Sequence, residues 1–460
     1  MTVPYLAAYG AALIAASLAT VLRPRSMLAF LWPVVLLHPH PVVREILPFQ
    51  RMGLQNWYLL LCLVLVLAHP RRLREGVRTA APVVRRTLVL LVLLALAHLH
   101  AVLVLWLRYP WLPGVGYGKL AEQLVSDLRY LVPMLAAIAY VRDRSDLVLA
   151  VRSFALALFA AFGLVIADRY TPGVFQLFNH TAYESTWPMH VERAVGGFGG
   201  PWEVGGIGAL GIVFATVAAV GQRVLRRSSA IALLVVTAVG VVFSVSRAGF
   251  VASALGLAGV LAVSRRRAKW SVLVLLLVAA GVLLFLQFEN PGGETTDIPG
   301  LVERGIDRAY EGGELKGSAA LRARIWREHL EYLRRGQLDW GQILAGFGGL
   351  EGVGVAFQST GHNGYLAPYL YFGLPWAVAL HLALLWVLLG AMKGGAWTRR
   401  PEILVMWATV LGGMVTSEFL ISGLTWSVLG FLVVVTAVSA TQEQQGAGVP
   451  AAPLPGGLRP

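Results

Sequence analysis

The sequence predicts an all-α polytopic membrane protein, and three observations support this prediction. Hydrophobic residues make up 57% of the 460-residue chain and charged residues only 13%, whereas soluble domains carry about 25% charged residues. Many apolar runs approach the roughly 20 residues that cross a bilayer as a helix, and a spanning segment must pair its own backbone amides. The basic residues, which give a formal net charge of +14, fall mainly between these runs, where they determine topology.

The apolar runs predict about 12–13 transmembrane helices in a single transmembrane domain, residues 1–441. The second run is short for a complete crossing and is also compatible with a re-entrant segment. No positively charged stretch precedes the first run, so we expect a membrane span there and not a signal peptide. The predicted spans are residues 4–22, 26–38, 54–69, 87–107, 122–140, 147–167, 202–221, 229–245, 248–264, 270–287, 363–391, 402–421 and 424–441.

The connecting segments alternate between arginine-rich and arginine-poor. Short arginine-rich segments are expected on the cytoplasmic side, which puts the N-terminus outside and the C-terminus inside. The remaining segments are then extracytoplasmic, and two of them are long, residues 168–201 and 288–362. Residues 442–460, rich in Gly, Pro and Gln, are expected to form a disordered cytoplasmic tail. The arginine-rich segments contain Arg23 and Arg25; Arg71, Arg72, Arg74, Arg78, Arg85 and Arg86; Arg142 and Arg144; Arg223, Arg226 and Arg227; Arg265, Arg266, Arg267 and Lys269; and Lys393, Arg399 and Arg400.

The large loop at 288–362 is expected to contain amphipathic helices, and residues 318–333 show the helical period. With about 100° per residue, Trp326 falls within about 80° of Arg322 on an apolar face, while Arg327 and Glu331 fall on the opposite face. An arginine on an apolar face needs a partner. That partner is either an acidic side chain of this protein or an anionic ligand, which a guanidinium binds bidentately. Trp326 itself is also compatible with a simple core position.

Three further positions on the predicted outer side could carry chemistry. Arg247 lies between two apolar runs with no room for a real loop; charges at the membrane often mark functional sites, although an arginine can also snorkel to headgroups. His362 precedes the span 363–391, and histidine is the usual proton acceptor near neutral pH, but a histidine at a helix end is often structural. Arg193 precedes a glycine-rich stretch and is either a ligand-binding residue or a solvated loop charge.

Several kinds of site are missing from the sequence. There is no Walker loop and no Cys/His cluster, and the single cysteine, Cys62, excludes an internal disulfide. No Asp-x-Asp pair on the predicted outer side offers carboxylates to a metal. We therefore expect no metal and no cofactor. Because the basic residues follow the membrane topology, we also expect no nucleic-acid partner.

Three local patterns resemble the O-antigen ligases and the related O-antigen polymerases of bacterial envelopes. They occur in the family's order over residues 190–375, whereas the N-terminal third is similar only in being apolar. A fourth pattern, Gly-x-Phe-x-x-Pro ending at Pro201, is similar too, but Trp202 stands where an Asn is common. The three patterns are Ser-x-Ser-Arg-x-Gly from Ser244 to Gly249, Arg-x-x-x-Trp from Arg322 to Trp326, and Gly-Phe-Gly at 346–348 followed by His-Asn-x-Tyr-Leu at 362–366.

The resemblance implies a glycosyltransferase similar to the multi-span type C enzymes, in the bacterial cytoplasmic (inner) membrane with its active site facing the periplasm. Its donor would be a glycan on undecaprenyl diphosphate, with the lipid tail between spans among membrane lipids. Its acceptor would be a sugar hydroxyl, on lipid A–core for a ligase or on another lipid-linked repeat for a polymerase. Such enzymes are expected to work without a metal and to invert the anomeric centre.

The roles implied by the resemblance fit the chemistry of the side chains. Without a metal, preorganised arginines must stabilise the departing diphosphate, and Arg247 and Arg322 are the candidates. His362 would be the general base that takes the proton of the acceptor hydroxyl, from the face opposite the leaving group. Substrate-binding roles fall to four residues, Arg193, Trp326, Asn363 and Tyr365.

Two other classes of function remain open. A lipid-linked glycan flippase or other secondary transporter would also need cationic residues and a lipid groove, but it should place polar residues near the membrane midplane and contain inverted repeats. The candidates here are expected at the outer surface, beside one large asymmetric loop. A purely structural membrane protein is the third alternative, and Arg322 on an apolar face argues against it.

Overall fold

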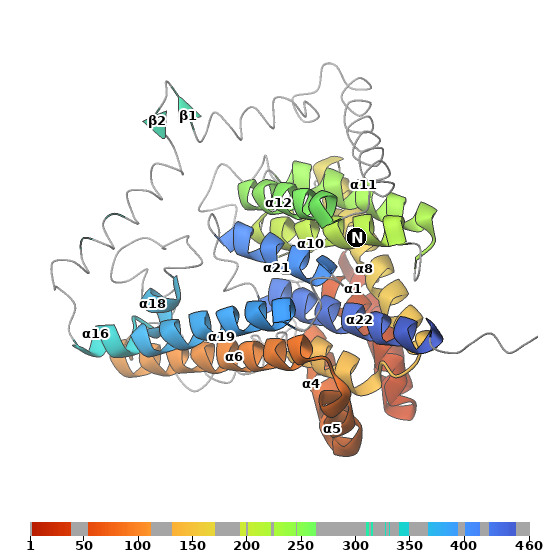
Figure 1. Cartoon of the computed structure of the whole chain (residues 1–460), viewed down its shortest axis with the longest axis horizontal. Coiled ribbons are helices and arrows are strands. Elements are labelled where there is room, and N and C mark those ends of the chain that lie inside the picture. Colours follow the sequence, from red (N-terminus) through yellow and green to blue (C-terminus); the bar gives the residue numbers. More distant parts are fainter. Residues whose placement is uncertain are drawn as a thin grey trace, which may run out of the picture.

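The computed structural model is a bundle of α-helices (Figure 1). It describes residues 2–37, 54–111, 131–170, 194–198, 201–221, 225–244, 246–263, 310–311, 314–315, 327, 331, 340–348, 367–393, 401–414 and 423–447. Its elements are α1 (Thr2–Leu22), η1 (Pro24–Ser26), α2 (Met27–Leu36), α4 (Leu54–Ala68), α5 (Pro70–Thr79), α6 (Pro82–Arg108), α8 (Arg144–Tyr170), α10 (Pro201–Gly221), α11 (Arg227–Phe243), α12 (Arg247–Val263), β1 (Tyr310–Glu311), β2 (Glu314–Leu315), α16 (Trp340–Ala345), α18 (Ala367–Phe372), α19 (Leu374–Lys393), α21 (Pro401–Met414) and α22 (Gly423–Ala447).

The helical membrane architecture agrees with the prediction at the level of fold class. Among the described residues, three helices are long and apolar enough to cross a membrane, namely α6, α8 and the Leu374–Ala391 part of α19. Shorter apolar helices lie at most of the other predicted spans. The total of about 12–13 spans stays a prediction, because the predicted span 270–287 lies outside the described residues and only 131–140 of the span 122–140 lies within them.

Three boundaries differ from the sequence-based expectation. The predicted span 363–391 is divided at Gly373 into α18 and α19, because Gly373 adopts a φ of 87° that does not continue a helix. The arginine-rich segment after span 54–69 forms a helix of its own, α5, which hydropathy alone did not reveal. Helix α22 continues to Ala447, past the predicted end of the last span.

An aromatic cluster lies where α2, α8, α10 and α22 meet. The ring of Trp32 packs edge-on against Phe154 and Phe431, with centroids 5.0 and 5.1 Å away. Phe154 also contacts Phe214, at a centroid distance of 5.5 Å. Pairs with this geometry stabilise beyond the area they bury, so the cluster joins four helices that are distant in sequence.

Several of the arginine-rich segments lie together at one end of the bundle, which we call the basic end. Arg25, after α1, forms ion pairs with Asp143 and Asp146 at the start of α8. Arg142 donates a hydrogen bond to the backbone carbonyl of Arg72 in α5. Helices α6 and α8 both begin at this end, and α16 and α18 lie at the other end of α6 (Figure 1). We call the opposite end of the bundle the far end.

The prediction that these arginine-rich segments share one side is therefore consistent with the contacts. Helices α6, α8 and α11 each have their first residue at the basic end, so each of them runs away from it. The turn after Arg193 and the start of α12 lie at the far end. The predicted segments around Arg322 and His362 lie outside the described residues.

Candidate functional site

Asp168, in the last turn of α8, anchors the turn that follows Arg193. Its side chain is only 8% exposed, and Oδ2 accepts hydrogen bonds from the backbone N–H groups of Val195 and Gly196, both at 3.0 Å. The other oxygen, Oδ1, has no hydrogen-bond partner among the described residues. The turn also reaches α11, because the N–H of Ala194 donates to the carbonyl of Phe243 at 3.1 Å.

The same turn docks closely against α8. Gly196 has a φ of 53°, and a Cβ at this position would lie 2.8 Å from the backbone nitrogen of Val165. Phe198 is buried and packs against Phe162 at a centroid distance of 5.4 Å. Only glycine meets both the backbone conformation and the close approach, so the residues after Arg193 have one fixed position on α8.

The hairpin between α11 and α12 is the second segment at the far end. Ser244 and Ser246 are buried there, and Ser246 Oγ accepts a hydrogen bond from the N–H of Gly249 at 3.2 Å. This bond satisfies one of the free amides in the first turn of α12, in the manner of an N-terminal cap. Arg247 is the first residue of α12, so its backbone lies at the partly positive end of that helix.

Helix α10 fixes this hairpin by a glycine-to-glycine crossing. A Cβ on Gly249 would lie 2.6 Å from the Cα of Gly205, and a Cβ on Gly205 would lie 2.9 Å from the nitrogen of Gly249. Neither position has room for a side chain. The turn after Arg193, the start of α10 and the start of α12 therefore occupy one region, held by α8 and α11.

The Gly-Phe-Gly turn forms a second group at the far end of α6. Phe347 is 2% exposed, and its N–H donates to the carbonyl of Leu370 in α18 at 2.8 Å. Arg108, the last residue of α6, donates from Nη1 to the carbonyl of Gly346 at 3.0 Å. His100 Nε2 lies 3.3 Å from the carbonyl of Ala345. The turn is thus bound between α6 and α18.

Three glycines make this arrangement possible. Gly346, Gly348 and Gly373 have φ values of 73°, 85° and 87°. A Cβ on Gly348 would lie 2.7 Å from the nitrogen of Leu105, and one on Gly346 would lie 2.5 Å from the nitrogen of Gly373. The turn therefore sits against the break between α18 and α19. It fixes the end of α18, a helix that begins immediately after the His362–Leu366 pattern.

Most of the predicted site residues lie outside the described residues. Only Arg247 is within them, and there only its place in α12 is described. The convergence of the predicted residues on one cavity stays a prediction. In the predicted amphipathic segment 318–333, Arg327 and Glu331 are helical and exposed, as expected for its polar face. The predicted site residues outside the described part are Arg193, Arg322, Trp326, His362, Asn363 and Tyr365.

The sequence analysis missed Asp168, Arg108 and His100. Asp168 is the only acidic residue of 147–170, and an acid at the edge of an apolar run was a usable signal because such residues need partners. The contacts of Arg108 and His100 could not be inferred, since both bind backbone carbonyls more than 200 positions away, at 346 and 345.

Comparisons with known proteins identify no relative. No model of a known protein family matches the chain, and none of the curated proteins matches it. Within the described ranges, no three His, Cys, Asp or Glu side chains come together as a metal site.

Proposed function

We propose that this protein is an O-antigen ligase-like glycosyltransferase. It would move a glycan from undecaprenyl diphosphate to a sugar hydroxyl of lipid A–core, at the outer face of the cytoplasmic membrane. One observation carries most of the argument: the hydrogen bond from Ala194 to Phe243 joins the segment after Arg193 to the hairpin that contains Arg247. The Gly-x-Phe-x-x-Pro stretch that ends at Pro201 and the stretch from Ser244 to Gly249 both resemble family patterns. They are about fifty residues apart in sequence, and this hydrogen bond makes them neighbours.

In the proposed reaction, the acceptor hydroxyl oxygen attacks the anomeric carbon of the donor while the bond to the diphosphate oxygen breaks. His362 takes the hydroxyl proton as general base. The diphosphate leaves as an anion and is stabilised by Arg247 and Arg322, with Arg193 contributing to binding. Trp326, Asn363 and Tyr365 would contact the sugars. The start of α12 adds a favourable field, since an anion is stabilised at a helix N-terminus.

Two alternatives use the same residues or the same surface. A polymerase would transfer the growing glycan to another lipid-linked repeat unit with the same catalytic groups. A flippase would need only to bind the diphosphate, and inverted repeats would be expected. The glycine-rich turns lie at the ends of helices and not at their middles, which favours an enzyme.

The test is complementation of a deletion strain in the native host, read by gel analysis of surface polysaccharide. For a ligase, deletion should remove long glycan from lipid A and leave free polymer on its carrier; for a polymerase, single-repeat products should appear. Arg247→Ala should fail to complement. Arg227→Ala is the matched control, because Arg227 is likewise the first residue of a helix, α11, but at the basic end.

Other outcomes would count against the proposal. Normal glycan transfer by Arg247→Ala, at a protein level equal to that of the control, would remove this arginine from the mechanism. Unchanged turnover by His362→Ala would place the base elsewhere. Strong inhibition by EDTA would require a metal, contrary to the proposed chemistry.

A further inference from the structure

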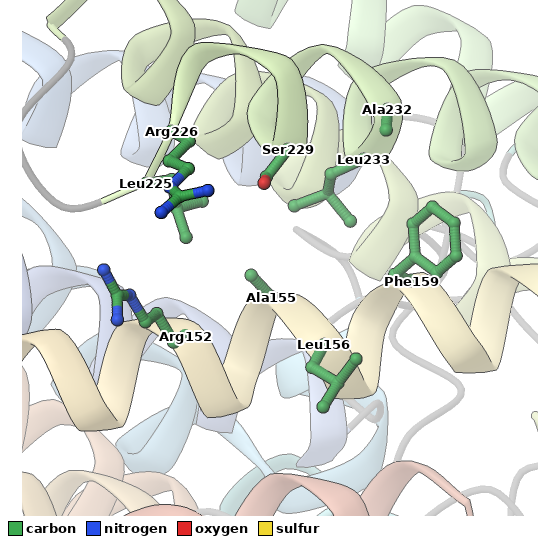
Figure 2. A pocket seen from close by; sticks show the side chains of 9 residues that line it. All are labelled: Arg152, Ala155, Leu156, Phe159, Leu225, Arg226, Ser229, Ala232 and Leu233. Carbon is green, nitrogen blue, oxygen red and sulfur yellow. The ribbon is translucent and has the colours of Figure 1, made fainter.

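A groove at the basic end lies between α8 and α11 (Figure 2). The candidate site lies at the opposite ends of both helices, near Asp168 and Phe243. Its volume is about 480 Å³, within the roughly 300–1,000 Å³ that ligand pockets usually have. Two helical stripes line it. Arg152, Leu156 and Phe159 come from α8, and Arg226, Ser229 and Leu233 come from the start of α11.

The two arginines face the groove from opposite walls (Figure 2). Both side chains are exposed, and no acidic residue is among the described residues that line the groove. Within the part of the chain that the structure describes, neither guanidinium forms an ion pair. Two guanidinium cations that face one groove repel each other, and an anion between them would remove that repulsion.

The start of α11 adds further donors beside these arginines. Arg226 caps the helix without a side-chain hydrogen bond, and no acidic residue lies in the first turn. The first amides of a helix have no partner within it, and they favour an anion. Ser229 contributes a hydroxyl to the same wall of the groove. The polar end of the groove therefore suits the oxygen atoms of a phosphate group.

The rest of the groove is apolar and opens toward the lipid-facing surface. Leu156 and Phe159 are 67% and 41% exposed, and both line the groove. Seven residues separate Arg152 from Phe159, a distance of about 10 Å along a helix. The groove is thus cationic toward the starts of α8 and α11 and apolar toward their middles, as a phospholipid is anionic at its headgroup and apolar in its chains.

We propose that this groove binds one acidic phospholipid from the leaflet at the basic end, with its phosphate between Arg152 and Arg226 and its acyl chains along Leu156 and Phe159. Basic pockets between transmembrane helices recognise acidic headgroups in this way. The inference is independent of the proposed glycan transfer, which uses the other end of the bundle.

The test uses the purified full chain in a mild detergent, with bound lipid counted by native mass spectrometry. Phosphatidylglycerol should be retained at one copy, and phosphatidylcholine should not compete for it. In an Arg152→Gln/Arg226→Gln variant the affinity for phosphatidylglycerol should fall about 30-fold, since each arginine near an acidic headgroup contributes a factor of about five. Ala232→Trp, which fills the groove without changing its charge, should also abolish retention.

The matched control is Arg144→Gln, which removes an exposed arginine from the same helix outside the groove. It should leave retention unchanged. Equal retention of phosphatidylcholine, or an equal loss in Arg144→Gln, would overturn the proposal. Complete displacement of phosphatidylglycerol by millimolar inorganic phosphate would do so as well, because the site would then be one for a free anion.

Discussion

Replacing Asp168 should release the turn that follows Arg193. In Asp168→Ala the amides of Val195 and Gly196 lose their common acceptor in a buried place. Each buried amide without an acceptor costs about 1–3 kcal/mol, so the two together should destabilise this turn by about 2–6 kcal/mol. Asp168→Asn keeps one carbonyl oxygen in place and should lose only the added strength of a charged acceptor, about 1 kcal/mol per bond.

Hydrogen exchange of the purified protein measures this loss directly. A destabilisation of about 2 kcal/mol should raise the exchange rate of the Val195 and Gly196 amides about 30-fold, because exchange follows the free energy of local opening. Peptides from the middle of α11 should be unchanged. Glu75→Ala, which removes an exposed carboxylate from α5, is the control. Unchanged exchange at Val195 and Gly196 in Asp168→Ala would show that Asp168 does not anchor this turn.

Two further variants test the packing. Gly249→Ala should lower the free energy of unfolding by about 1–3 kcal/mol, the usual cost of overpacking, because its Cβ would meet Gly205. The control is Gly163→Ala, which has no atom within 4 Å of the new Cβ and should be neutral or stabilise by up to about 1 kcal/mol. The measurement is unfolding in graded SDS, and equal effects of the two substitutions would refute the close crossing. Arg25→Ala should destabilise the protein by about 3 kcal/mol, because it leaves the buried carboxylate of Asp146 without its ion-pair partner. Adding Asp146→Asn should recover part of that loss. If nothing is recovered, the broken ion pair is not the cause of the destabilisation.

The sequence predicted the helical membrane class because burial in lipid demands long apolar runs and closed backbone hydrogen bonding. Three of the described helices, α6, α8 and part of α19, are long and apolar enough to cross a membrane. The segments around Arg25, Arg72 and Arg142 were expected on one side, and their contacts agree with this. It failed at α5, where each turn contains charged residues and mean hydropathy is low although the helical period is intact. It also failed at Gly373, since a glycine in an apolar run does not reveal whether another segment packs against it.

The candidate site was predictable only in its parts. The serines before Arg247 and the glycines around Phe347 marked turns, and both turns are tightly packed at the far end. Their partners were not predictable, because a hydrogen bond such as that from Arg108 to Gly346 depends on how α6 lies beside α18. Such pairings come from tertiary packing, which local sequence patterns do not encode.

The double attachment of the Gly-Phe-Gly turn has a consequence for how this protein can vary. Gly348 contacts α6 at Leu105, while Phe347 binds the carbonyl of Leu370, so the described chain on either side of residues 349–366 is held together independently of the length of that segment. Lengthening such a connection twofold costs only about 0.6 kcal/mol in chain entropy. Insertions and deletions at 349–361 should therefore be tolerated by the fold, and homologues could vary in this segment without repacking a single helix.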